Sequence, residues 1–453
     1  MKELLADTAA RAAHYLENIG DRPVAPSREV IAHLEELGGA LPEAPSDPRE
    51  VLALLDRAGS PATVASAGGR YFGFVTGGSL PAALATNWLA AAWDQNAAMR
   101  VGSPVAAKLE EIAGAWILEL LGLPASSGFG CVTCTTMANF SGLAAARSAV
   151  LARTGWNVEE DGLFGAPPIR VLVGGEVHVS LLRALTMLGL GRGRVTKVPV
   201  DGQGRMRAEA LPALDANTIV CIQAGNVNTG AFDPSRDICA RARDVGAWVH
   251  VDGAFGLWGA VSPLYAPLLD GVNSADSWAV DCHKWLNVPY DSGMVIVRDG
   301  EHLRRALSTS SAAYLTQSSG REPWQYTPEA SRRARGVELW AAIRSLGRSG
   351  LRELIERNCR QARMFAERLH AAGFNVLNDV VLNQVLVSFG SAEETRRVVA
   401  EIQADGTCWC GGTVWQGHTA MRISVSSWAT TDDDVEKSVA AMIRIAKNCK
   451  VTA

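Results

Sequence analysis

A lysine follows a short β-branched run near residue 280. Lys284 stands in the segment DCHKW at 281–285, directly after the strand-like residues 277–280. A lysine among Trp, Leu and Val would be costly to bury in its charged form, so we expect a lowered pKa and a neutral amine. Such an amine can attack a carbonyl carbon and form a Schiff base. The alternative is a solvent-exposed lysine in a polar loop.

An acidic residue closes a second run of the same kind. Asp252 follows the strand-like residues 248–251 and precedes Gly253 and Ala254. An acid at the end of a buried strand needs a partner, because burying an unpaired charge is expensive. A cofactor nitrogen that has to stay protonated, as in pyridoxal phosphate sites, would be such a partner. The alternative is an aspartate that caps the following turn.

Small and hydroxyl-bearing residues open a helix after residue 130. The segment GCVTCTTMAN at 130–139 contains Thr135 and Thr136. Hydroxyl groups and free backbone N–H groups at a helix start form an anion site that suits a phosphate. Plain helix capping explains the same residues equally well. Cys131 and Cys134 form a single C-x-x-C without a second pair, so we expect no metal site.

The three motifs gain weight from their order along the chain. Phosphate anchor, acid and lysine follow one another on successive strand–helix units, as a pyridoxal phosphate site on a parallel sheet requires. Motifs of other chemistries are missing, including a G-x-G-x-x-G after a strand, a Walker loop, H-E-x-x-H and G-x-S-x-G. We therefore expect pyridoxal 5'-phosphate as the cofactor.

The elements that must position these residues alternate between strand and helix. We expect strands at 169–173, 218–222, 248–251, 277–280 and 294–297, with helices at 179–188 and 235–245. This alternation predicts an α/β fold with a mainly parallel sheet flanked by helices. Another helix begins at Ser103-Pro104, which is an N-cap followed by proline at the first helical position.

The pattern changes beyond residue 312. A Ser-rich loop precedes long helices, strand-like residues 385–389 and 421–425, and a last helix with three aspartates in its first turn. These features predict a smaller C-terminal α+β domain. The predicted organisation is an N-terminal helical segment contributing to a dimer at 1–80, a large cofactor-binding α/β domain at 81–311, and a mobile loop with the small domain at 312–453.

Composition excludes several classes of protein. The 453 residues are 48% hydrophobic and 20% charged, with 43 basic against 47 acidic side chains. A net charge of −4 gives no footprint for nucleic acid or an anionic membrane. The uncharged stretch 71–93 is interrupted by Gly and Pro, so we expect buried interior or subunit contact there rather than a membrane span. The nine cysteines are scattered along the chain, and the N-terminal segment carries charged residues from its second position, unlike a signal peptide. Both features predict a cytoplasmic enzyme.

Residues 277–293, SWAVDCHKWLNVPYDSG, resemble the Schiff-base segment of the group II pyridoxal-phosphate-dependent amino-acid decarboxylases. That family includes the aromatic-amino-acid, glutamate and tyrosine decarboxylases, and the similarity runs from about residue 71 to the C-terminus. The resemblance implies a fold-type I architecture, an amino-acid substrate, and a homodimer with interfacial active sites.

The resemblance also implies roles for individual residues. A histidine ahead of a helix, such as His178, is otherwise more often a structural hydrogen-bond partner. The implied roles are Schiff-base formation by Lys284, pairing with the pyridine nitrogen by Asp252, stacking on the ring by His178, packing on its opposite face by Ala254, and phosphate contacts by Thr135, Thr136 and His283.

Two further positions match the family nearer the C-terminus. Tyr314 matches the loop tyrosine that resembles the family's catalytic proton donor, and a phenol there can protonate the carbanion left by carbon dioxide. Relatives that make aldehydes typically have phenylalanine at this position, so tyrosine favours an amine product; a tyrosine that merely packs the loop is the alternative. Arg422 resembles the family's C-terminal arginine, which would hold a substrate carboxylate or order the site, with a surface arginine as the alternative.

Some positions depart from the family pattern. Residues 223–230, QAGNVNTG, replace a threonine-rich stretch, and Met137 stands where many relatives have glutamate. The aromatic side chains Tyr71, Phe72, Phe74 and Trp93 weakly suggest an apolar or aromatic substrate, although aromatic residues in such a stretch are more often core.

We expect a carboxy-lyase that converts an L-amino acid to the corresponding amine and carbon dioxide. The alternatives are an aldehyde synthase, an aminotransferase or another lyase on the same fold. A non-catalytic protein that binds pyridoxal phosphate is a further alternative.

Overall fold

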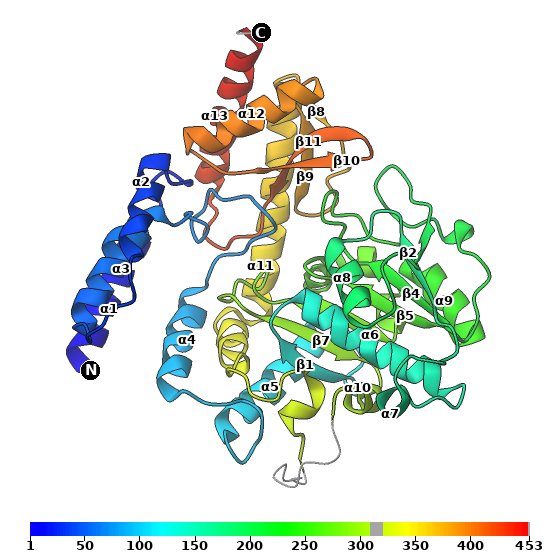
Figure 1. Ribbon diagram of the computed structural model, residues 1–453. Helices are drawn as coiled ribbons and strands as arrows, with labels where there is room; N and C mark the ends of the chain where they lie inside the picture. The colour runs from blue at the N-terminus through cyan, green and yellow to red at the C-terminus, as the bar shows by residue number, and fades with distance from the viewer. Residues whose placement is uncertain (309–319, 452–453) are drawn as a thin grey trace. The chain divides into compact units, whose positions relative to one another are not determined.

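The computed structural model describes residues 1–308 and 320–451 (Figure 1). The chain forms two compact units. One unit contains Met1–Thr76, Gln361–Leu377 and Val385–Ala453, and the other contains Gly77–Arg360 and Asn378–Gln384. The three-part organisation expected from the sequence stays a prediction.

A seven-stranded sheet forms the centre of the larger unit. In spatial order the strands are β1 (Gly128–Val132), β7 (Gly293–Val297), β6 (Ser277–Asp281), β5 (Trp248–Asp252), β4 (Thr218–Gln223), β2 (Arg170–Gly174) and β3 (Thr196–Val198). Strand β7 runs antiparallel to both β1 and β6, and the other neighbouring pairs are parallel. Every residue of β5, β6 and β7 is buried, as expected for strands covered on both faces. The predicted α/β class is confirmed.

Helices follow most of these strands. Helix α6 packs against α8 and α10, and also against β5, β6 and β7 (Figure 1). The helices of this unit are α4 (Pro81–Trp93), α5 (Pro104–Leu120), α6 (Thr135–Ala152), α7 (Val158–Asp161), α8 (Val179–Met187), α9 (Ser235–Val245), α10 (Gly300–Leu307) and the first part of α11 (Gly336–Ala371). Ser103 caps α5 by accepting the Ala106 N–H at 3.4 Å, as its sequence predicts.

The other unit carries a four-stranded sheet in the order β10 (Gly411–Trp415), β11 (His418–Ser424), β9 (Gln384–Ser388) and β8 (Asn375–Val376). Its helices are α1 (Lys2–Glu17), α2 (Arg28–Ala32), α3 (Pro48–Ala62), α12 (Ala392–Asp405) and α13 (Asp432–Val451). The acidic first turn of α13 complements the positive end of the helix dipole. These elements confirm the predicted small α+β part.

The sequence analysis does not predict four of the strands, β1, β3, β8 and β10. Strands β3 and β8 are very short, and strands β1 and β10 each contain two glycines, which have a low strand propensity. In β1, a Cβ added at Gly128 or Gly130 would collide with the backbone of Gly300 or Tyr326. Close backbone packing therefore explains why these positions are glycine. Across residues 1–308 and 320–451, every helix is too short or too polar to span a bilayer.

Candidate active site

Lys284 lies in the turn that follows strand β6. Its Nζ is 2.8 Å from Oδ2 of Asp281, and both side chains are largely buried. Burial by itself lowers the pKa of Lys284, but the charge and hydrogen bond of Asp281, together with the charges of Asp252 and Tyr290, raise it by more, so the pKa lies above its ordinary value. The expected lowering of the lysine pKa is therefore wrong. The sequence shows the apolar neighbours of Lys284 but not the ion pair.

Asp281 is a site residue that the sequence analysis missed. Its Oδ1 accepts the backbone N–H of Thr135 at 2.6 Å and lies 3.7 Å from Nε2 of His283. Burial raises the pKa of Asp281, but the charge of Lys284 and the hydrogen bonds from Lys284 and Thr135 help to outweigh burial and hold the pKa below its usual range. Asp281 ends a buried strand just as Asp252 does, so the same strand-end argument could have found it.

The start of helix α6 lies next to this pair. Cys134 occupies the N-cap position and provides no side-chain cap, and Oγ1 of Thr135 is buried without a hydrogen-bond partner in the described chain. A Cβ added at Gly293 would lie 2.9 Å from the backbone of Cys134, so β7 approaches this turn too closely for a side chain. Asp281 already accepts the N–H of Thr135, and the unused Thr135 hydroxyl with the next N–H groups of the first turn fits an anion such as a phosphate.

Asp252 ends strand β5, one strand away from Asp281. Its carboxylate accepts the side-chain amide of Asn139 at 3.1 Å and the backbone N–H of Ala254 at 3.3 Å. Within residues 1–308 and 320–451, no basic side chain forms an ion pair with Asp252. The carboxylate does act electrostatically on the amine of Lys284. A buried carboxylate held only by neutral donors fits a protonated ring nitrogen as its partner.

His178 occupies the N-cap of helix α8, at the carboxyl side of β2. Its Nδ1 accepts the backbone N–H of Ser180 at 3.3 Å. Gln223, the last residue of β4, donates its amide to the carbonyl of Glu176 at 3.1 Å and so ties the loop before His178 to the sheet. The structure thus gives His178 a capping contact, and its stacking role stays a prediction.

His283 is buried beside the lysine turn. Its Nδ1 accepts the backbone N–H of Ser292 at 3.2 Å, and its ring lies 4.3 Å from the ring of Tyr290. Burial lowers its pKa. A neutral ring that accepts at Nδ1 carries its proton on Nε2, the nitrogen that faces Asp281. That proton is available to a phosphate oxygen, and the contact itself stays a prediction.

The remaining predicted residues are not brought to this cluster by the described contacts. Arg422 lies on β11 in the smaller unit, and burial lowers the pKa of its guanidinium. Tyr314 lies outside the described residues. Phe72 is buried against Phe365, with ring centroids 4.9 Å apart, and Tyr71 stacks on an indole ring. For these two aromatic residues, the core interpretation is the correct one.

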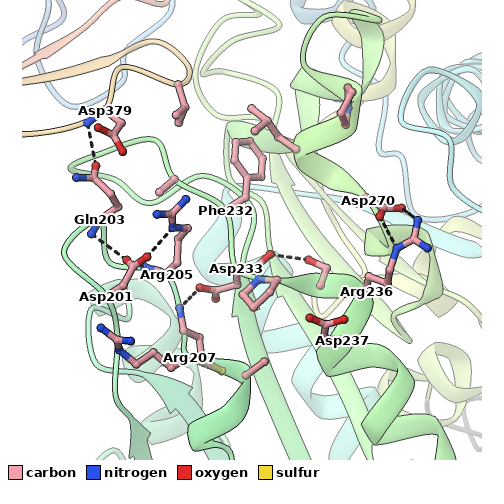
Figure 2. Close-up of a pocket in the computed structure, with 18 of the residues that line it drawn as sticks. Asp201, Gln203, Arg205, Arg207, Phe232, Asp233, Arg236, Asp237, Asp270 and Asp379 are labelled. Atoms are coloured by element: carbon pink, nitrogen blue, oxygen red, sulfur yellow. Dashed lines mark hydrogen bonds and ion pairs between the residues drawn. The ribbon is translucent and has the colours of Figure 1, made fainter.

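A separate surface pocket of about 580 Å³ lies on the larger unit (Figure 2). Its charged side chains largely pair with one another: Arg205 with Asp201 at 2.7 Å, and Arg236 with Asp270. Buried Asp233 accepts two backbone N–H groups there. None of the predicted site residues lines this pocket, and its paired charges give an anionic cofactor no available cation among those described.

Residues 58–390 match the family model described as the pyridoxal-dependent decarboxylase conserved domain. The chain belongs to this family. It is therefore a pyridoxal-phosphate-dependent carboxy-lyase, as the Schiff-base segment predicts. The family assignment covers the whole cluster around Lys284, Asp281 and Asp252.

Curated relatives act on different amino acids or give different products. The chain is 27% identical over 397 residues to tryptophan decarboxylase 1 of Oryza sativa subsp. japonica, covering 79% of this chain and 76% of that protein. It is 25% identical over 370 residues to the aromatic-L-amino-acid decarboxylase of Bacillus atrophaeus, covering 79% and 74%. It is 28% identical over 284 residues to phenylacetaldehyde synthase of Petunia hybrida, covering 59% and 55%.

Solved structures share the fold over almost the whole chain. The crystal structure of Oryza sativa TDC with PLP and tryptamine matches with a TM-score of 0.91 at 23% identity, covering 99% of this chain and 97% of that one. Mouse CSAD matches with a TM-score of 0.91 at 21% identity, covering 98% of each chain. The family's fold-type I architecture is therefore confirmed.

Pyridoxal phosphate is the cofactor, and the residues present fit its phosphate, its aldehyde and its ring nitrogen. The first turn of α6 with the unused Thr135 hydroxyl suits the phosphate. The amine of Lys284 suits the aldehyde. The Asp252 carboxylate, which lacks an ion pair in the described chain, suits the ring nitrogen.

Proposed function

We propose that this chain removes the α-carboxylate of an L-amino acid as carbon dioxide and releases the corresponding amine. Family membership supports decarboxylation. The observation that carries the site assignment is the pair of buried strand ends at β5 and β6. There the carboxylate of Asp252 acts on the amine of Lys284, beside the start of α6.

Lys284 is the residue that binds the cofactor covalently in this proposal. Its amine must lose a proton before the lone pair can attack a carbonyl carbon. The ion pair between Nζ and Oδ2 of Asp281, 2.8 Å apart, fixes the position of the amine in the buried turn, which reduces the entropy that attack has to overcome.

The cofactor supplies, when bound, a conjugated ring that accepts the electron pair of the breaking carbon–carboxylate bond. Asp252 holds a proton on the ring nitrogen in this proposal. The first turn of α6 with Thr135 and Thr136, together with His283, holds the phosphate. His178 stacks on one face of the ring, and Ala254 packs on the other.

Two residues complete the proposed chemistry. Tyr314 protonates the α-carbon after carbon dioxide leaves. Arg422 holds a carboxylate of the substrate or orders the site. Its guanidinium is buried enough to lower its pKa, and no acidic side chain in the described ranges pairs with it, which supports a role in binding an anion.

An aldehyde-forming reaction is the second candidate. One relative, from Petunia hybrida, is a phenylacetaldehyde synthase. Tyr314 favours the amine, because the resemblance to the family implies a tyrosine proton donor there and typically phenylalanine in members that form aldehydes. The two reactions share the cofactor and the first bond cleavage, so only the product distinguishes them.

Mass-spectrometric product analysis tests the proposal. The protein loaded with pyridoxal phosphate is incubated with each common amino acid separately, and a Lys284→Ala sample provides the blank. Release of an amine from at least one amino acid is the expected result. An aldehyde as the main product would support the second candidate, and a keto acid as the product would overturn both.

We also propose a homodimer with active sites at the interface. Helix α4 supports this proposal, because the side chains of Trp88, Leu89 and Trp93 are about half exposed on it. Large apolar side chains at this density are unusual on a free surface. Light scattering coupled to size-exclusion chromatography should give twice the chain mass, and a monomeric mass would contradict the proposal.

A further inference from the structure

A chain of hydrogen bonds lies behind the Asp252 carboxylate, along the face of the sheet that α6 covers. Asn139 on α6 bonds to Asp252, and His250 on β5 bonds to Asn139 at 2.9 Å. Ser277 on β6 bonds to the other ring nitrogen of His250 at 2.8 Å, and the indole of Trp248 bonds to Ser277 at 2.9 Å. All five side chains are buried.

Chemistry fixes the direction of every bond in this chain. A carboxylate only accepts, so Asn139 must donate its amide N–H to Asp252 and offer its oxygen to His250. The Nε2 of His250 therefore carries a proton. Burial lowers the pKa of His250 to about 3, so the ring is neutral and its Nδ1 has a lone pair.

The remaining two bonds follow from that tautomer. Nδ1 of His250 accepts the hydroxyl proton of Ser277, and Ser277 accepts the indole N–H of Trp248, which can only donate. Every hydrogen then points along one path that ends at Oδ2 of Asp252. Hydrogen bonds aligned in one direction polarise one another, which strengthens the last bond to the carboxylate.

The fold leaves room for this arrangement at one glycine. A Cβ added at Gly142 on α6 would lie 2.9 Å from Cε1 of His250 and 3.1 Å from its Nδ1. Gly142 thus lets the imidazole fit between α6 and the sheet. Asn139 lies one turn after Thr135 on the same helix. Helix α6 therefore carries both a predicted phosphate contact, Thr135, and the residue that bonds to Asp252, the predicted partner of the ring nitrogen.

We propose that Asn139, His250 and Ser277 are positioning residues that orient Oδ2 of Asp252 and keep its carboxylate unprotonated, so that it holds a proton on the ring nitrogen of the cofactor. This inference rests on the proposed role of Asp252. We call this chain of hydrogen bonds, from Trp248 through Ser277, His250 and Asn139 to Asp252, the relay. The relay contributes only neutral donors. It therefore stabilises the carboxylate without supplying a positive charge that would compete with the ring nitrogen.

The test measures the ring nitrogen directly. The protein is loaded with pyridoxal phosphate labelled with ¹⁵N in the ring, and the nitrogen chemical shift is recorded for wild type, Asn139→Leu and Ser277→Ala. Wild type should show a protonated nitrogen. Asn139→Leu should move the shift toward the unprotonated value and raise the cofactor dissociation constant about tenfold, as for loss of a hydrogen bond to a charged group. Ser277→Ala should move both in the same direction by less.

Ser148→Ala is the matched control. Ser148 is a buried serine on the same helix whose hydroxyl has no hydrogen-bond partner in the described chain, so its loss should leave the shift and the dissociation constant unchanged. A wild-type shift in both Asn139→Leu and Ser277→Ala would overturn the relay. If Asn139→Leu does not fold, as judged by circular dichroism, Ser277→Ala decides.

Two further measurements separate the relay from the proposed function. Asp252→Asn should itself shift the ring nitrogen toward the unprotonated value. If it does not, the assignment of Asp252 fails; if it does while the relay variants leave the shift unchanged, only the relay fails. Imidazole ¹⁵N shifts in the wild-type protein should place the His250 proton on Nε2, and a proton on Nδ1 would overturn the relay without any variant.

Discussion

Two aspartates end neighbouring strands, and the structure treats them differently. Asp281 at the end of β6 is paired with Lys284 at 2.8 Å, and its pKa lies below its usual range. Asp252 at the end of β5 is held by the Asn139 amide and a backbone N–H, with no basic partner among the described residues. One carboxylate is neutralised by Lys284, and the other is left for a cation that residues 1–308 and 320–451 do not provide.

A third buried aspartate lies close to another negative charge. Asp233 accepts the backbone N–H groups of Met206 and Gln223, each at 2.7 Å. Burial, together with the negative charge of Asp201, nevertheless raises its pKa to about 6. At Asp281, in contrast, the adjacent Lys284 ammonium helps to outweigh burial, and the pKa is lowered.

The largest effect should come from removing the cation of the Asp281 pair. Lys284→Ala should lower turnover by about 10³-fold or more, because the amine that binds the cofactor is lost. It should also abolish the visible absorption band of the bound cofactor. Lys108→Ala, which removes an exposed lysine on α5, is the control and should keep both properties. A borohydride-stable cofactor adduct on another lysine would refute the assignment.

Removing the anion of the same pair should cost stability. Asp281→Asn leaves the Lys284 ammonium buried without its partner and should lower the free energy of unfolding by about 3 kcal/mol. The pKa of Lys284 should also fall, which borohydride trapping of the cofactor as a function of pH would detect. Asp270→Asn breaks the exposed pair with Arg236 (Figure 2) and should cost much less, because solvent screens both charges. Equal losses of unfolding free energy in Asp281→Asn and Asp270→Asn would contradict the expected difference between a buried and an exposed ion pair.

The relay behind Asp252 should make the protein sensitive to acid. His250 has a pKa near 6.5 when unfolded and about 3 when folded, so unfolding takes up a proton as the pH falls below 6.5. This proton uptake should lower the free energy of unfolding by about 2 kcal/mol between pH 7.5 and pH 5. Urea unfolding at the two pH values measures this loss. His250→Gln should show a smaller loss, and an equal loss would contradict the neutral, buried imidazole.

Asp233 should give a smaller effect with the opposite sign. Its pKa is raised from 3.8 in the unfolded chain to about 6, so the folded state loses stability as the pH rises through that range. The contribution amounts to about 1 kcal/mol between pH 5 and pH 7. Asp233→Asn should remove this slope from the urea-unfolding profile, whatever its effect on overall stability. An unchanged slope would show that Asp233 does not titrate there.

The sequence predicts the strand ends well and the partners across them poorly. Lys284 and Asp252 could be placed because each follows a β-branched run, and those runs form β6 and β5 within one residue of the expected bounds. The pairing of Lys284 with Asp281 could not be predicted, because it depends on the backbone conformation of the turn after β6, which the sequence does not specify. Asn139 and His250 are 111 positions apart, so their contact depends on the packing of α6 against the sheet.

The glycine at the start of the larger unit has a consequence for how the chain folds. A Cβ at Gly77 would collide with the carbonyl oxygen of Lys284, and Gly78 donates its N–H to the side chain of Asn287 at 2.7 Å, a separation of 209 positions. The segment around Gly77 and Gly78 therefore cannot pack in its final position until the turn that contains Lys284 and Asn287 has been synthesised. Ordering of this segment therefore waits for more than half of the polypeptide, and a nascent chain shorter than that must leave it exposed to chaperones.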